Sequence, residues 1–324
     1  IKPEICLEGG NVLLDRQGFA EPKHPLLSLR STGIRNDVDL TSANATSAAT
    51  AQAARLAALT MSRYPSYWPE TVRALLVHEA RWTRPMQEHL NACGKKKSKR
   101  TRLLRRYGWG VPTEEAVLTS SHRAVTMVVQ DEFHPFDETY AMRELRLHAL
   151  PWPRDVLQSL GEADVRLRIT LSYFIEPSAT RRGWKGKYTY ASYGLRFDLK
   201  ASTDITVKRF LARVNRQAQE EEDEAYSSSE NHSKHWLLGT RARHNGSLHQ
   251  DDWQGTGAEL AACDHIAVYP VGGWWKNNNR GDRRDLPVRY ALLVSLSTSA
   301  QGADLYTPIA AQLSVPVTAV PIEV

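Results

Sequence analysis

The chain has 324 residues, of which 41% are hydrophobic and 24% charged, and a formal net charge of +6. This length suffices for two domains with separate cores, and no apolar run approaches the roughly 20 residues of a membrane-spanning helix, which argues against a membrane partner. The three cysteines (Cys6, Cys93 and Cys263) are far apart and form no CxxC pair, which argues against a zinc site or a disulfide framework and indicates a reducing compartment, the cytoplasm.

The first 120 residues are predicted to be mainly helical after an extended start. Pro3–Cys6 reads as an extended segment that ends at Gly9-Gly10, and a turn-rich connection follows. Ser47–Met61 is rich in Ala and Leu and predicts a helix that stops before Pro65. A second helix is expected from Pro69, with a buried stripe formed by Val72, Leu75, Leu76 and Ala80.

A strongly basic run follows this second helix. Residues 95–102 read Lys-Lys-Lys-Ser-Lys-Arg-Thr-Arg, and Arg105 and Arg106 continue the run. We interpret it as a solvated loop, with an acidic counterpart at Glu220–Glu224. The alternative is a segment that binds nucleic acid with a steep salt dependence. No nucleic-acid partner is expected, because the run lacks the interleaved aromatic residues of single-strand binders.

After about residue 120 the pattern changes to strands. Four runs alternate apolar with polar or small residues, namely 165–173, 195–199, 266–268 and 290–296. This pattern predicts antiparallel sheets with one buried face each, stacked as a sandwich. An acidic helical segment, Val207–Glu224, interrupts the strands, and we expect a mobile insertion near residues 206–235.

The segment Thr41–Thr50 presents a serine at the first turn of a helix of small residues. Backbone N–H groups at a helix start have no partner within the helix. They can stabilise an oxyanion beside an attacking hydroxyl, here that of Ser47. The small neighbours Ala45, Ala48 and Ala49 would let a substrate backbone come close. The alternative is that Ser47 merely caps a packing helix.

Four segments resemble, in order, those of subtilisin-like serine proteases, the subtilases or peptidase S8 family. Residues 2–10 resemble the K-P-D-V-x-A-P-G segment, and residues 44–50 resemble the N-G-T-S-x-A-T/S motif. Residues 68–79 resemble the helix that follows this motif, and residues 107–116 resemble the closing G-x-G-x-[VP]-[ND]-x-x-x-A segment. The resemblance implies that residues 1–135 are the C-terminal part of an α/β catalytic domain with a parallel sheet, from a divergent bacterial branch.

The resemblance makes Ser47 the nucleophile of a serine endopeptidase and its backbone N–H one oxyanion donor. Asn44, Ala45 and Thr46 would support the turn and the substrate. Ala45 stands where the family usually has Gly, and Gln52 stands where it usually has Pro. No cofactor is expected, since the calcium sites common in the family belong mostly to upstream segments.

The family's catalytic Asp and His, and its oxyanion Asn, precede the serine by well over a hundred residues. Local residues offer no replacement for them, whether His24, the aspartates or the asparagines (Asp15, Asp37, Asp39, Asn11 and Asn36). We therefore expect this chain to be inactive alone. Its expected partners are a polypeptide substrate and the N-terminal part of the same protease, either covalently joined or as a separate chain.

Residues 136–324 resemble the β-sandwich domains, jelly-roll-like, that some bacterial subtilases append. The competing function is a non-catalytic module that binds protein or glycan through exposed aromatic residues (Trp184, Tyr188, Tyr190, Trp274 and Trp275). We favour packing of these residues against the protease domain. A histidine cluster has no tetrahedral ligand spacing, so no metal is expected at His232, His235, His244 and His249.

Overall fold

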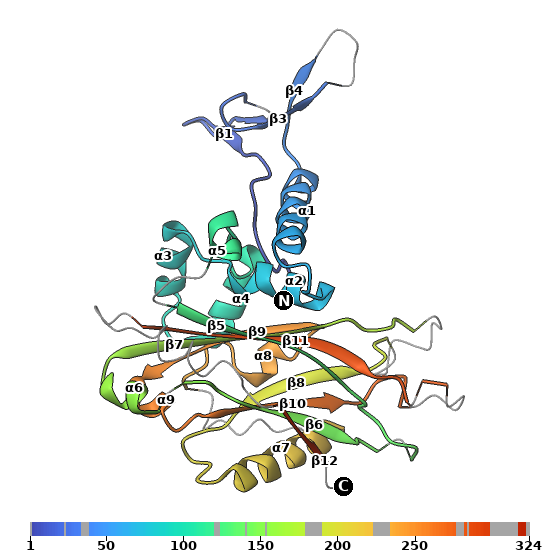
Figure 1. The fold of residues 1–324 in the computed structure, drawn as a ribbon. Coiled ribbons are helices and arrows are strands. Elements are labelled where there is room, and N and C mark those ends of the chain that lie inside the picture. The colour runs from blue at the N-terminus through green and yellow to red at the C-terminus, as the bar shows by residue number, and fades with distance from the viewer. Residues whose placement is uncertain are drawn as a thin grey trace.

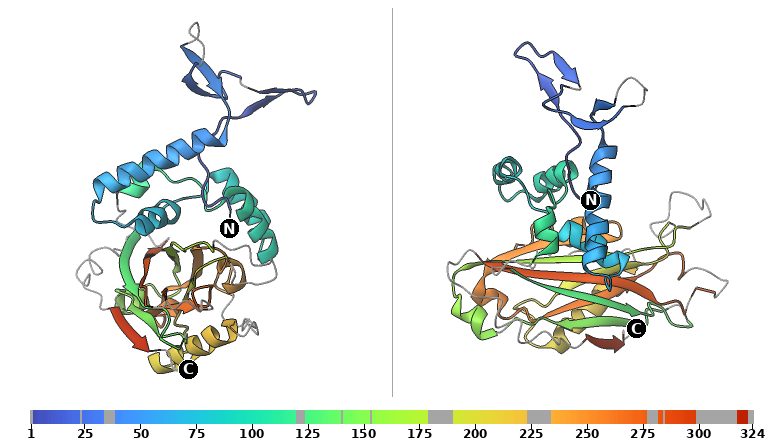
Figure 2. Two further views of the ribbon diagram at one scale, coloured as in Figure 1. Left: turned by 90° about the vertical axis from the view of Figure 1, so that its right-hand side faces the viewer. Right: turned by 45° about the horizontal axis from the view of Figure 1, so that its top comes forward.

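The computed structural model describes residues 2–22, 24–33, 39–119, 124–139, 141–152, 154–178, 190–222, 234–276, 282–283, 285–298 and 317–321. Two four-stranded antiparallel sheets form the lower part of the molecule in Figure 1. Helices from the first 119 residues lie over one of these sheets, and two small hairpins project beyond the helices (Figures 1 and 2).

The chain starts with two short hairpins. One pairs β1 (Val12–Leu14) with β2 (Ala20–Pro22), and the other pairs β3 (Leu29–Thr32) with β4 (Leu40–Ala43). Five helices follow: α1 (Thr46–Arg63), α2 (Pro69–His78), α3 (Arg84–Ala92), α4 (Lys97–Tyr107) and α5 (Glu114–Leu118). The two predicted helices, α1 and α2, are confirmed, and Pro69 opens α2 where its missing N–H costs nothing.

The basic run is a helix, α4, and the prediction of a solvated loop is wrong. Like charges three and four residues apart disfavour a helix. Leu103 and Leu104 offset this repulsion, because both are buried and Leu104 packs with Val77 and Trp109.

The parallel sheet expected in the first domain does not occur among the described residues. Every strand pairing between them is antiparallel. Strands β1 to β4 have three or four residues each and pair across short connections. A parallel pair requires a crossover of a dozen or more residues, which these connections do not supply.

One sheet has the strand order β5-β11-β7-β9, and the other β12-β6-β10-β8. The strands of the first are β5 (Ala124–Phe133), β11 (Val288–Thr298), β7 (Asp164–Tyr173) and β9 (Leu248–Thr256). Those of the second are β12 (Val317–Pro321), β6 (Glu144–Ala149), β10 (His265–Val271) and β8 (Gly194–Leu199). The four runs with alternating apolar residues lie in β7, β8, β10 and β11, so these strand predictions are confirmed.

A single hydrophobic core joins the two sheets. It contains Leu167 and Ile169 of β7, Phe197 of β8 and Ile266 of β10, all with no exposed surface. The remaining helices are α6 (Arg154–Ser159), α7 (Val207–Glu222), α8 (Thr240–Arg243) and α9 (Gly257–Leu260).

Helix α7 confirms the predicted helical segment but not its mobility. It lies against β10, below the second sheet in Figure 1. Phe210, Val214 and Ala218 recur at helical spacing, and all three are fully buried in the same hydrophobic cluster as the sheet residues. The expected mobile insertion is therefore wrong for this part of residues 206–235.

The first sheet is buried on both faces, whereas the sequence predicted one buried face. Helix α2 packs on β7 and β11 (Figure 1). The polar residues that alternate along β7 are buried beneath it, and His78 Nδ1 lies 2.8 Å from the Thr170 hydroxyl. Arg168 donates to the carbonyl oxygens of His78 and Ala80 at 2.7 and 2.8 Å, and so satisfies the end of α2. The helices and this sheet are therefore one packed unit.

Three buried histidines make the stability of this unit dependent on pH. Burial lowers the pKa of His78 and His249 well below 6.5, and that of His148 to about 4. Below pH 6.5 the unfolded chain binds protons at these sites that the folded chain does not bind. We expect the free energy of unfolding to fall between pH 7 and pH 5, by roughly 2 kcal/mol for His148 alone.

Asp251 opposes this trend, since burial raises its pKa to about 6 and so stabilises the folded chain as the pH falls through that value. The stability that the three histidines remove as the pH falls is larger than the stability that this one carboxyl group adds. Urea titrations at pH 7 and pH 5 measure the difference, and His148→Gln should make it smaller. An unfolding free energy equal at both pH values would contradict the expected neutral histidines.

Candidate active site

Ser47 is exposed in the first turn of α1. Ala45 caps this helix with φ −161° and ψ 146°, an extended conformation that any residue adopts. Alanine in place of the family's usual glycine therefore leaves the turn unstrained. Within the described part of the chain, neither the hydroxyl nor the backbone N–H of Ser47 makes a hydrogen bond. Both groups are available to a bound substrate.

The segment Glu8–Gly10 holds the start of α1 in place. The N–H of Ala45 donates to the carbonyl oxygen of Gly9 at 2.8 Å. Gly10 has φ +83°, and a Cβ atom there would lie 2.2 Å from Asn44 Oδ1, so no larger residue fits without a shift. Gln52 Nε2 donates to the carbonyl oxygen of Glu8 at 2.6 Å, which a proline at this position could not do.

The contact between Gly10 and Asn44 is not predictable from the sequence pattern. The Gly9-Gly10 pair predicts the end of an extended segment and belongs to the first segment of the resemblance, and neither feature indicates a contact with Asn44. Asn44 was predicted to support the turn, and it donates from Nδ2 to the carbonyl oxygen of Asn11 at 2.7 Å, while its Oδ1 is buried without a hydrogen-bond partner. A glycine pair ahead of a motif is a usable signal for a close approach, but it does not identify the residue that comes close.

The remaining two segments of the resemblance also meet the first, and in residues 68–79 the contact is made by Arg73, whose Nη2 lies 3.7 Å from Glu4 Oε1. Trp109 N–H donates to the carbonyl oxygen of Glu4, and Cys6 N–H to that of Gly110, both at 2.8 Å. Gly108 has φ +55°, and a Cβ atom there would lie 2.3 Å from the Glu4 carbonyl oxygen. The segments that are separated in sequence are therefore contiguous in space around α1 and α2.

No described residue supplies a base for Ser47. His24 Nδ1 accepts a hydrogen bond from the Leu26 N–H at 3.3 Å, and Asp15 Oδ1 accepts from two backbone N–H groups of its own turn. Asn11 Oδ1 accepts from the Val12 N–H at 2.8 Å. Asn36 and Asp37 lie outside the described residues.

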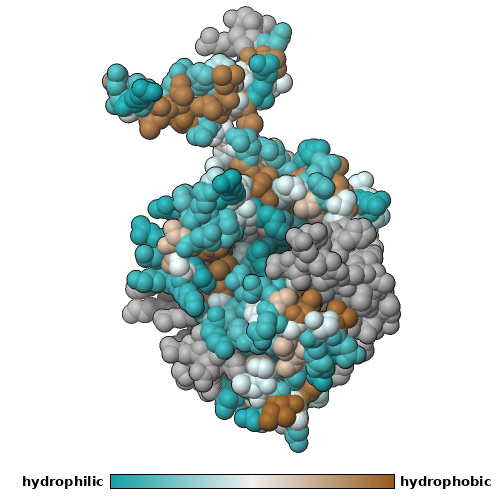
Figure 3. Space-filling model, turned by 90° about the vertical axis from the view of Figure 1, so that its left-hand side faces the viewer, coloured by the Kyte–Doolittle hydropathy of each residue, from teal (hydrophilic) through white to brown (hydrophobic). Residues whose placement is uncertain are grey.

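Apolar side chains are exposed on the two hairpins beside Ser47. Figure 3 shows hydrophobic residues gathered there, where the hairpins project from the body. The most exposed are Leu26 (87%), Phe19 (75%), Leu14 (66%) and Leu40 (55%). Monomeric soluble proteins rarely expose such contiguous apolar surface, which is typical of an interaction site.

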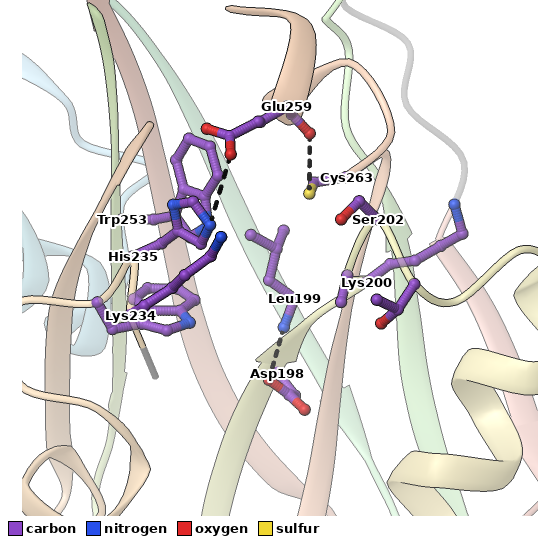
Figure 4. A pocket seen from close by; sticks show the side chains of 12 residues that line it. Asp198, Leu199, Lys200, Ser202, Lys234, His235, Trp253, Glu259 and Cys263 are labelled. Carbon is purple, nitrogen blue, oxygen red and sulfur yellow. Dashed lines mark hydrogen bonds and ion pairs between the residues drawn. The ribbon is translucent and has the colours of Figure 1, made fainter. Parts of the chain in front are cut away.

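A cavity separate from Ser47 lies beside the sheets (Figure 4). It is a cavity of about 400 Å³ between β8, β9 and α9. The His235 ring stacks on Trp253 with centroids 5.0 Å apart, and its Nε2 lies 3.8 Å from Glu259 Oε1.

Neither Cys263 nor Lys200 of this cavity is an activated nucleophile. The Cys263 thiol donates to the carbonyl oxygen of Glu259 at 3.5 Å, and burial raises its pKa to about 12. The thiol therefore stays protonated and unreactive at neutral pH. Lys200 Nζ is engaged with Asp264 Oδ1 at 2.9 Å.

Trp274 and Trp275 do not form the alternative aromatic surface, and their described hydrogen bonds and ring contacts are with residues 176–276, not with residues 1–135 as expected. Both indole N–H groups donate to Glu176, one to its carbonyl oxygen and one to its carboxylate, each at 2.9 Å. The Trp275 ring is buried against Tyr193, with centroids 5.1 Å apart. Hydrogen bonds and ring packing within residues 136–324 engage both side chains. Tyr190 is exposed, and Trp184 and Tyr188 lie outside the described residues.

The histidine cluster is dispersed in the structure. His244 and His249 stack with centroids 5.9 Å apart, His235 lies at the cavity, and His232 is outside the described residues. Among the residues that the structure describes, no group of three or more His, Cys, Asp or Glu could hold a metal ion. No helix in the described part of the chain is long and apolar enough to cross a membrane.

Comparison with known families matches residues 1–110 to the subtilase family, peptidase S8. This range contains the exposed serine and three of the four segments described above. The match supports a subtilisin-like family for this third of the chain and, at the level of the family, a serine protease and hydrolase. A search of curated proteins found no match.

Proposed function

We propose that this chain carries the nucleophile of a subtilisin-type serine endopeptidase. The observation that carries the proposal is the position of Ser47, exposed in the first turn of α1 with its hydroxyl and N–H unbonded. Ser47 Oγ attacks the scissile carbonyl of a polypeptide and forms an acyl-enzyme, which water then hydrolyses. The Ser47 N–H donates to the oxyanion as it develops.

The general base comes from an upstream segment of a bacterial subtilase. A histidine of that segment, oriented by an aspartate, takes the proton from Ser47 and later returns it to the leaving amine. An upstream asparagine completes the oxyanion site. The absence of any base beside Ser47 among the described residues supports this division of the catalytic groups.

The upstream segment also covers the hairpins. Burying the exposed side chains of Leu14, Phe19, Leu26 and Leu40 stabilises the joined protein by about 1.5–3 kcal/mol for each side chain that becomes fully buried. The sheets support helices α1 and α2.

All three cysteines are free, which supports a reducing, cytoplasmic compartment.

The test is a protease assay on a fluorescent unfolded protein, made with this chain alone and with the same chain joined to its upstream segment. We expect turnover only in the second case. An upstream mutant without its histidine is the control. Equal turnover by the chain alone, or none in the joined protein, would overturn the proposal.

A further inference from the structure

The positive charge of the molecule is concentrated in one short segment. Residues 95–106 contain eight Lys and Arg and no Asp or Glu. Without them the chain would hold 34 Lys and Arg against 36 Asp and Glu, a slight negative excess. The segment therefore accounts for the whole positive excess of the protein.

Helix α4 sorts these cations into two groups. Lys97 and Arg100 are half-buried: burial lowers the pKa of Lys97, and Arg100 Nε donates to the carbonyl oxygen of Gly94 at 2.8 Å. The other six are exposed, namely Lys95, Lys96, Lys99, Arg102, Arg105 and Arg106.

The exposed cations follow the helical repeat. Lys99, Arg102 and Arg106 stand at positions i, i+3 and i+7, so they share one face of α4. Leu104 is buried on the opposite side of the helix, and Leu103, four residues after Lys99, is buried at the edge of this face, so both leucines fix its orientation. We name these three cations, together with Arg105 and with Lys95 and Lys96 just before the helix, the α4 basic face.

The described residues offer the α4 basic face no carboxylate partner. Across the ranges that the structure describes, none of its six side chains forms an ion pair. The neighbouring helix α3 offers Glu88, but Glu88 pairs with Arg84 at 3.2 Å on the same helix. The like charges of these cations repel one another, which destabilises the helix. Burial of the two leucines stabilises the helix and so keeps the cations close together despite this repulsion. A polyanion would relieve this repulsion.

The residue composition of the α4 basic face indicates which class of partner it binds: a protein, a membrane or a nucleic acid. Protein interfaces are built around aromatic and apolar anchors and are depleted in lysine. No large apolar side chain is exposed on α4. A membrane-bound amphipathic helix buries its apolar side in lipid, whereas Leu103 and Leu104 are already buried in the protein. Recognition of a nucleic-acid backbone needs only cations.

We propose that the α4 basic face binds the phosphodiester backbone of nucleic acid, without sequence preference. We depart here from the expectation drawn from the sequence, because a helix fixes the spacing of charges that a loop would leave free. The proposed protease activity is not needed for this binding.

The test is fluorescence anisotropy with a labelled 20-base-pair duplex, as DNA and as RNA, and the full chain. Binding should weaken with salt, with a slope of log Kobs against log salt between about −3 and −5. The triple variant K99Q/R102Q/R106Q should bind at least about tenfold more weakly at about 50 mM salt, with a slope smaller in magnitude by roughly 2.7.

A matched control removes three exposed cations elsewhere, as R16Q/K208Q/R209Q, and should bind like the unmodified chain. Circular dichroism should show that both variants remain folded. Three results would overturn the proposal: equal binding by K99Q/R102Q/R106Q and the unmodified chain, equal weakening in both variants, or binding to phosphatidylserine vesicles or polyglutamate with none to either duplex.

Discussion

Replacing Ser47 with alanine is expected to abolish peptide hydrolysis by the protein joined to its upstream segment. The variant should lose about 10⁶-fold in kcat, the size of loss that follows removal of the nucleophile in subtilisin. The reason is that no acyl-enzyme can form without the hydroxyl, while oxyanion donors and substrate binding give only residual catalysis. Initial rates with a fluorescent peptide measure the effect.

Thr50→Ala is the matched control for this substitution. Thr50 is also exposed and lies one turn further along α1, where its hydroxyl donates to the Thr46 carbonyl oxygen at 3.0 Å. It should change kcat less than tenfold, because it lies outside the proposed catalytic group. A Ser47→Ala variant that is folded and keeps more than a hundredth of the activity would show that another residue is the nucleophile.

Replacing Arg168 with methionine is expected to destabilise the whole fold by about 3–5 kcal/mol. Arg168 is 4% exposed and donates to Asp252 from Nε at 2.8 Å. Its charge and that of Arg166 hold the pKa of Asp252 well below its usual range against the opposing effect of burial. Methionine fills much of the space but leaves Asp252 with Arg166 alone, and leaves the His78 and Ala80 carbonyl oxygens without this donor.

Urea unfolding measures this loss, and Arg84→Met is the control. Arg84 has a side chain that is 92% exposed and pairs only with Glu88, so its loss should cost less than about 0.5 kcal/mol. Two separate unfolding transitions, or a cost below about 1 kcal/mol for Arg168→Met, would contradict the packing of α2 and β7 as one unit.

The alternation of side chains predicted the strands but not what covers them. Leu167, Ile169 and Leu171 point into the core between the sheets, as the pattern indicated. Thr170 and Ser172 alternate with them and read as solvent-facing, yet both are buried. A local pattern does not distinguish water from a polar helix surface such as that of His78, which lies within hydrogen-bond distance of the Thr170 hydroxyl.

The site could be predicted in part. The order of four short segments placed Ser47 at the start of a helix, and the structure brings those segments together. The close approach of Gly10 to Asn44 could not be predicted from the sequence, because the two residues are 34 positions apart. The run at residues 95–106 was interpreted as a solvated loop, whereas burial of Leu104 against Val77 and Trp109 stabilises the helix over residues 97–107.

The most direct test of the central claim is labelling by a serine-reactive phosphonate probe, with the labelled residue identified by peptide mapping. In the protein joined to its upstream segment, the label should be on Ser47. In the chain alone, no label is expected, because no described base activates the hydroxyl. Labelling of Ser47 in the chain alone would contradict the need for upstream groups, and labelling of another serine in the joined protein would contradict Ser47 as the nucleophile.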